Sequence, residues 1–163
     1  MLFRSDQSGE VEFWRHAANG LGESTRVTRK GTTMRHQGVP SPDGKLLAHT
    51  DRNQVLWLRE LASGAEREVA RSQEGNEWDY IDLTWSPDSR WVAYVDLASN
   101  QTQRIFLYDT KGQAAPVPIT TGRLDSHSPK IGRASGRERV EISGGAVTLK
   151  QKSQKRHKHP VRP

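Results

Sequence analysis

Two copies of one turn-and-strand unit constrain the fold more than any other feature of this sequence. "SPDGKLLAHT" occupies 41–50 and "SPDSRWVAYV" occupies 86–95, an offset of 45 residues. In such a turn, proline presets φ at the second position and aspartate at the third position tolerates the bridge region. The alternating apolar, β-branched and aromatic residues after each turn predict a strand. We therefore expect the chain to repeat a supersecondary unit.

Each copy continues with two more predicted strands. The next strand lies in "QVLWLRE", from Gln54, and in "RIFLYD", from Arg104, and each leads to a glycine turn. The last strand of each copy is expected near Val69 and near Ile119. Upstream, "LFRSDQSG", "EVEFWRH" and "STRVTR" predict the second, third and fourth strands of an earlier copy. "RLDSHSPK" is expected to begin a further copy.

Four short strands repeated roughly every 40–50 residues are typical of β-propeller blades. We therefore predict an all-β fold, a partial β-propeller of about three four-stranded blades with a disordered basic C-terminal tail. The predicted blades are 1–33, 34–76 and 77–121, with the start of a fourth at 122–130 and the tail at 131–163.

Three blades would not close a ring, because closed propellers need roughly four to eight blades. The outer blades would then expose apolar flanks and unpaired strand edges, so we expect marginal or concentration-dependent folding. A sharp, reversible, monomeric thermal transition would contradict this expectation. The flank residues expected to be exposed are Leu56, Leu58, Ile105 and Leu107.

The basic charge of the chain is confined to its C-terminal part. The net charge is +6, but residues 1–131 carry 16 Lys and Arg against 17 Asp and Glu. This nearly neutral part gives no electrostatic case for nucleic-acid binding by residues 1–130. No stretch approaches the roughly 20 apolar residues of a membrane span, and the start lacks the apolar core of a signal peptide. We expect a cytoplasmic protein, or a periplasmic one if the true N-terminus carries a signal peptide.

Several segments resemble the propeller repeats of the tricorn/TolB type: "WSPDSRWVAYV", "SPDGKLLAHTDRNQVLWLRELASG" and "RIFLYD". The order of "SGEVEFWRH", "GVPSPDGK" and "NQVLWL" is similar to that in the first propeller of bacterial tricorn-type serine peptidases. The resemblance covers roughly Leu2 to Lys130. It implies a propeller that guides or gates peptides toward a separate C-terminal peptidase region, with a serine nucleophile, its histidine partner and a PDZ-like module. No segment of this chain matches that region, so no catalytic residue is carried over.

The segment from residue 131 departs from the repeat. Where the resemblance would imply another SPDG-type blade, "IGRASGRERV" leads into a run rich in Lys, Arg and His. This segment looks like the ends of translated assemblies in which adapter or vector DNA has been read as coding sequence. We favour such an artefactual end over a genuine disordered basic tail, and an independent reading of the source DNA across codons 125–140 separates the two. The run "KRHKHP" at 155–160 is assigned no function.

Single aspartates and histidines give weak metal candidates. Asp43 and Asp88 each stand alone in a turn, whereas calcium loops need several carboxylates at close alternate spacing. We favour a turn role in which each aspartate accepts hydrogen bonds from its own backbone. His16, His36 and His49 lack the close histidine partners of a zinc site, which favours surface or packing roles. The sequence therefore predicts neither a metal ion nor a cofactor.

The stretch "LDSHS" superficially contains a catalytic triad. Its members are Asp125, Ser126, His127 and Ser128. Neighbours along a strand point to opposite faces, so they cannot form a chain of nucleophile, base and orienting acid. We favour an innermost strand of the next blade here and predict no catalytic residue.

The tryptophans could form an aromatic ligand cage. Trp57, Trp85 and Trp91 lie in or beside predicted strands, where large rings more often fill the space between blades. Trp78 lies in a loop between two blades, a place that often lines a propeller face, but packing against the loop is favoured there too.

Two functions remain open. The chain is either a non-catalytic propeller segment of a tricorn-like serine peptidase, or part of a TolB-like scaffold propeller that docks a protein partner. The expected partners are peptides or a protein bound through the propeller faces, together with the rest of the parent peptidase. What the intact gene encodes downstream discriminates the two.

Overall fold

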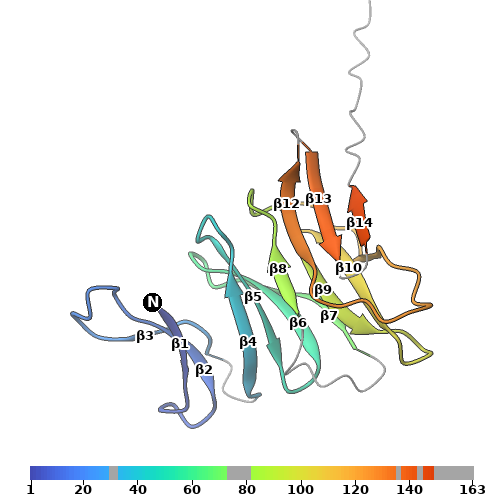
Figure 1. Cartoon of the computed structure of the whole chain (residues 1–163). Coiled ribbons are helices and arrows are strands. Elements are labelled where there is room, and N and C mark those ends of the chain that lie inside the picture. Colours follow the sequence, from blue (N-terminus) through green and yellow to red (C-terminus); the bar gives the residue numbers. More distant parts are fainter. Residues whose placement is uncertain (30–32, 73–81, 135–136, 143–144, 149–163) are drawn as a thin grey trace, which may run out of the picture.

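The computed structural model describes residues 1–29, 33–72, 82–134, 137–142 and 145–148. After Gly132 it describes only the backbone of these residues. These residues form antiparallel sheets that follow one another along the chain (Figure 1). Among them, no helix is long and apolar enough to cross a membrane. The predicted all-β partial propeller is confirmed.

Two sheets contain four strands each, in chain order across the sheet, and we call them the second and third blades. The second blade consists of β4 (Arg35–Pro40), β5 (Leu46–Asp51), β6 (Val55–Glu60) and β7 (Glu66–Arg71). The third blade consists of β8 (Leu83–Trp85), β9 (Trp91–Leu97), β10 (Gln103–Asp109) and β11 (Val117–Pro118). The two Ser-Pro-Asp turns join the first strand of each blade to the second.

The two Ser-Pro-Asp turns also contact each other. Within the first turn, the Ser41 hydroxyl donates to Asp43 Oδ1 at 2.6 Å, and Gly44 has a φ of 69°. Ser89 takes the place of that glycine in the second turn, with a φ of 62°. Its hydroxyl accepts a hydrogen bond from the Asp43 backbone N at 3.0 Å. Ser89, which stands where the first turn has Gly44, therefore links the second blade to the third through its side chain.

The first blade has three described strands: β1 (Leu2–Ser5), β2 (Glu12–Arg15) and β3 (Thr25–Arg26). Hydrogen bonds show how it aligns with the third blade. The Phe13 N donates to Thr28 Oγ1, just as the Ile105 N donates to Thr120 Oγ1. Leu56 has the same place in the second blade, because it lies opposite Thr50 as Ile105 lies opposite Val95. Phe13, Leu56 and Ile105 are all almost fully buried.

A fourth sheet contains β12 (Lys130–Ala134), β13 (Arg137–Ile142) and β14 (Gly145–Thr148). Ile131 lies opposite Val140, and Val140 lies opposite Val147, so β-branched residues share one row across the sheet. Ile131 also packs against the buried residues of the third blade. The prediction of a tail without strands from residue 131 is therefore corrected as far as residue 148. Residues 149–163, including "KRHKHP", lie outside the described residues, and their predicted disorder stays a prediction.

Two further expectations are wrong. "LDSHS" is not an innermost strand, because β12 begins later, at Lys130, and Ser128 has a φ of 52° that no extended strand allows. The apolar flanks are not exposed either. Leu56 and Leu58 are buried between the second and third blades, and Ile105 and Leu107 pack with Ile131 of the next sheet. Sheet-on-sheet stacking covers these side chains.

Candidate functional site

The interface between the second and third blades is apolar. Trp85 belongs to its buried cluster, is 7% exposed, and donates from its indole Nε1 to the Val39 carbonyl oxygen at 2.9 Å. A large ring whose single polar group is satisfied contributes much apolar burial at little polar cost. The other buried residues of this cluster are Ala48, Leu58, Val92 and Tyr108.

The rim of this interface is closed by one arginine. The Arg67 guanidinium carbon lies 5.5 Å from the centre of the Tyr108 ring, a cation–π distance. The same guanidinium donates from Nη2 to the Thr110 carbonyl oxygen. Arg67 thus spans from the outer strand of the second blade to the third blade and fills the space between them.

The interface between the first and second blades is instead charged. Arg35 lies between two carboxylates, with its Nε 3.6 Å from Glu12 Oε2 and its Nη1 3.7 Å from Asp51 Oδ2. All three side chains are at most 3% exposed. Arg26 adds a second cation 3.3 Å from Glu12, and the Trp57 indole N donates to Asp51 at 2.8 Å. Such a cluster holds the blades together only as long as its charges balance.

A second polar group lies beside this cluster. His49 is fully buried, with Nε2 3.2 Å from Glu66 Oε1, and Arg59 Nη1 lies 3.1 Å from the same oxygen. Burial lowers the pKa of His49 and outweighs the opposite effect of Glu66 and Asp51. Burial alone would raise the pKa of Glu66, but the His49 hydrogen bond and the charges of Arg35 and Arg59 lower it overall. Near neutral pH, neutral His49 therefore donates to the Glu66 carboxylate.

The buried histidine predicts a loss of stability in mild acid. The unfolded chain binds a proton at His49 near its ordinary pKa of 6.5, whereas the folded chain resists protonation. The free energy of unfolding should therefore fall below pH 6.5, by up to about 1.4 kcal/mol per pH unit. In urea titrations at a series of pH values, His49→Gln should flatten this slope. His16→Gln, at a partly exposed position, should leave it unchanged, and equal slopes in both variants would contradict the assignment.

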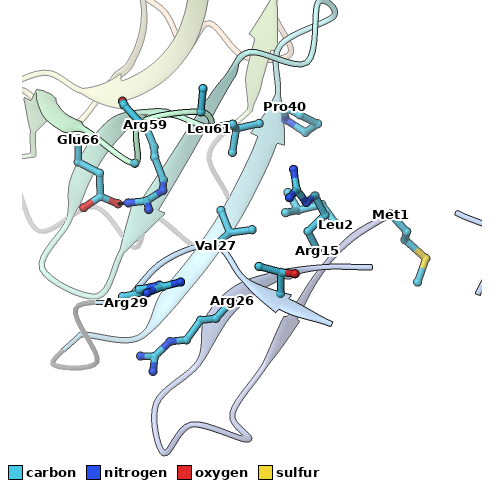
Figure 2. A pocket seen from close by; sticks show the side chains of 14 residues that line it. Met1, Leu2, Arg15, Arg26, Val27, Arg29, Pro40, Arg59, Leu61 and Glu66 are labelled. Atoms are coloured by element: carbon cyan, nitrogen blue, oxygen red, sulfur yellow. Dashed lines mark ion pairs between the residues drawn. The ribbon is translucent and has the colours of Figure 1, made fainter. Parts of the chain in front are cut away.

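A cleft of about 710 Å³ opens between the first and second blades (Figure 2). It lies between the outer strand of the first blade and the β6–β7 turn of the second. Among the lining residues that the structure describes, four are arginines and one, Glu66, carries a carboxylate. The lining residues are Met1, Leu2, Arg15, Thr25, Arg26, Val27, Arg29, Pro40, Arg59, Leu61, Ala62, Ser63, Gly64 and Glu66.

This cleft occupies the place that Arg67 fills in the next interface. Thr25 lies opposite Arg15 in the first blade, as Arg67 lies opposite Leu58 in the second. Arg15 and Leu58 are themselves equivalent, because Arg15 lies two residues after Phe13 and Leu58 lies two residues after Leu56, the equivalent buried residue of the second blade. The first blade therefore has a short threonine where the second blade has the arginine that spans the rim.

The facing blade differs in the same way. Arg59 of the second blade is equivalent to Tyr108 of the third. Arg59 directly follows Leu58, Tyr108 directly follows Leu107, and the two strands pair in the same register. Arg59 turns to Glu66 instead of packing as a ring. A short side chain on one face and a retracted one on the other leave the cleft open.

The predicted turn role of the aspartates agrees with their contacts. Asp43 Oδ1 accepts from the Ser41 hydroxyl and the Lys45 backbone N, and Asp88 Oδ1 accepts from Ser86 and Arg90 in the same way. Hydrogen bonding by Ser41 and the Lys45 backbone lowers the pKa of Asp43. Among the residues the structure describes, no group of three His, Asp or Glu side chains could hold a metal ion.

The residues of "LDSHS" do not line up as a triad. Asp125 accepts from the Gln103 backbone N at 2.9 Å, so it anchors the loop to β10. Ser128 donates its hydroxyl to Asp82 at 3.1 Å, and His127 Nδ1 lies 3.4 Å from the Ser128 oxygen. The Ser128 hydroxyl donates its hydrogen bond to the Asp82 carboxylate, whereas the serine of a triad donates to the histidine.

The single histidines and the tryptophans are spread over the fold. His16 contacts the neighbouring Ala17 carbonyl oxygen, His36 lies on β4, and the His49 ring packs 5.6 Å from Phe13. Of the tryptophans, Trp85 fills an interface between blades as expected, and Trp91 packs partly buried on the next apolar cluster. Trp57 donates to Asp51 in the charged interface, and Trp78 lies outside the described residues.

Known proteins share this series of blades. The Tricorn protease homolog of Saccharolobus solfataricus is 29% identical over 113 residues, which are 69% of this chain and 10% of that protein. A Tricorn-like protease C-terminal subunit of Sulfurisphaera tokodaii is 32% identical over 83 residues, 50% of this chain and 9% of that protein. The crystal structure of the tricorn protease matches 85% of this chain with a TM-score of 0.70 at 18% identity, over 14% of its own length. These blades form a tricorn-type propeller region.

The tricorn-type region spans about a tenth of the length of the two curated relatives. A TolB structure from Agrobacterium tumefaciens shares the fold more distantly, with a TM-score of 0.51 and 20% identity over 79% of this chain and 50% of that one. No protein-family model matches the chain.

Sequence reasoning missed the cleft of the tricorn-type region. A signal was present in the repeat, because aligning the last strand of each blade sets Thr25 against Arg67 and Val117. Arg15 and Arg29 then appear as cations beside a small residue at a blade interface. This alignment requires the register of the paired strands, and that register is defined by hydrogen bonds of the folded chain. The sequence alone therefore does not provide it.

Proposed function

We propose that this chain is a non-catalytic propeller segment that guides or gates peptides toward the peptidase region of a tricorn-like parent protein. The observation that carries the proposal is the ordered similarity to a Tricorn protease homolog over 69% of the chain. The open, arginine-lined cleft between the first two blades adds a surface able to hold an extended ligand. Peptides and the rest of the parent peptidase are the proposed partners, and the cytoplasm is the proposed compartment.

A second candidate function is docking of a folded protein by a TolB-like scaffold. The structural match to TolB, which spans half of that chain, favours it. In this case the faces of the blades would bind a folded surface, and short extended peptides would not compete for it.

A binding experiment distinguishes the two candidates. The 163-residue chain is titrated by calorimetry with a set of short unstructured peptides of mixed sequence. Guidance of peptides predicts weak but saturable binding with mutual competition among the peptides. Absence of binding by every peptide at millimolar concentration would contradict it and would leave the docking scaffold as the better account.

A further inference from the structure

We infer that the cleft between the first and second blades binds an acidic segment of a peptide, with Arg15 and Arg29 holding its carboxylates. The inference rests on the proposed peptide-handling function and names the class of peptide. Among its described lining residues, the cleft has four arginines and one carboxylate. An anionic ligand would balance the excess positive charge.

Two of the four arginines are already engaged. Arg59 pairs with Glu66, and Arg26 pairs with Glu12 and donates to the Thr28 carbonyl oxygen. Arg15 and Arg29 are exposed, and within the described part of the chain neither has a polar partner. Their guanidinium groups are therefore free to form the bidentate hydrogen bonds that carboxylates accept.

The rest of the lining suits a peptide better than a nucleic acid. Leu2, Val27 and Leu61 give the cleft apolar patches beside its cations. Among the lining residues described, none is aromatic, so bases would have no ring on which to stack. Alternating apolar and acidic side chains on an extended peptide would match both kinds of surface.

The neighbouring interface supplies a closed version of the same place. There Arg67 reaches across Tyr108, whereas the cleft has Thr25 and Arg59 at the equivalent positions. The double substitution Thr25→Arg/Arg59→Tyr copies the closed arrangement into the open one. It leaves the net charge unchanged, so its effect on binding reports on the cleft itself and not on overall electrostatics.

The test is fluorescence anisotropy of the full chain with labelled peptides of equal length. One peptide alternates Glu with Ala, a second alternates Gln with Ala, and a third alternates Lys with Ala. A single-stranded oligonucleotide of the same charge as the Glu peptide is the fourth probe. Arg15→Gln/Arg29→Gln removes the proposed contacts. Arg52→Gln/Arg123→Gln removes the same charge at two exposed positions outside the cleft. Circular dichroism verifies that each variant is folded.

We expect the Glu peptide to bind at least about tenfold more tightly than the Gln peptide, with an affinity that falls as salt is raised. Arg15→Gln/Arg29→Gln and the closed-cleft variant should each weaken its binding about tenfold, while the control pair changes it less than about twofold. Equal binding of the Glu and Gln peptides, or equal loss in the control pair, would overturn the inference and leave peptide handling intact. The inference would also be overturned if the oligonucleotide bound more tightly than the Glu peptide and lost this binding in Arg15→Gln/Arg29→Gln. Failure of all three peptides to bind would instead remove the proposed function.

Discussion

Replacing Arg35 with Met is expected to lower the free energy of unfolding by about 3–5 kcal/mol. The substitution keeps an unbranched apolar stem but leaves the carboxylates of Glu12 and Asp51 buried without their shared cation. Arg26 still pairs with Glu12 and the Trp57 indole still donates to Asp51, but two buried carboxylates lose the cation between them, which costs far more than losing an ion pair at the surface. Urea denaturation followed by tryptophan fluorescence measures the change.

Two further variants make this result specific to the buried cluster. Arg71→Met breaks an ion pair with Glu68 whose side chains are 45% and 42% exposed, and it should cost no more than about 0.5 kcal/mol. Adding Glu12→Gln to Arg35→Met should recover part of the loss, because one buried charge is removed. If Arg35→Met cost no more than Arg71→Met, the charged cluster would not hold the first blade to the second.

Replacing Trp85 with Ala is the second large effect, with an expected cost of about 3–5 kcal/mol. The indole lies between the second and third blades, where its removal leaves a cavity next to Ala48, Leu58 and Val92. It also leaves the Val39 carbonyl oxygen without the donor 2.9 Å away. Thermal and urea unfolding measure the cost.

A conservative variant separates packing from hydrogen bonding at this position. Trp85→Phe keeps an aromatic ring in the interface but has no donor for Val39, so its cost should be nearer to about 1–2 kcal/mol. A cost for Trp85→Ala below that of Trp85→Phe would show that the apolar interface does not stabilise the stack of blades.

Strands that follow a strong turn could be predicted from the sequence. The short apolar runs at 46–50 and 91–95 come directly after a Ser-Pro-Asp turn, and the structure has strands there, β5 (Leu46–Asp51) and β9 (Trp91–Leu97). The innermost strand β4 gave no such signal, since "RHQGVP" contains glycine and proline. Its glycine has a structural cause: a Cβ on Gly38 would lie 2.4 Å from the Phe13 ring. The close approach of Phe13 from the first blade requires glycine at position 38, so β4 lacks the residue pattern that predicts a strand.

The charged interface and the cleft depend on contacts between blades and were not predicted. Glu12, Arg35 and Asp51 are far apart in the sequence, and nothing local marks them as buried. His49 was expected to be a surface or packing residue, and it packs against Phe13 while hydrogen-bonding Glu66. The strands beyond residue 130 were missed because the many charged residues there masked the row of Ile131, Val140 and Val147.

The most direct test of a peptide-handling tricorn-type segment is a crystal structure of the chain with the alternating Glu-Ala peptide. We expect stacked blades with the peptide in the cleft between the first and second blades, and its carboxylates within hydrogen-bonding distance of Arg15 and Arg29. A peptide bound elsewhere on the chain, or a cleft filled by the chain's own side chains, would contradict it.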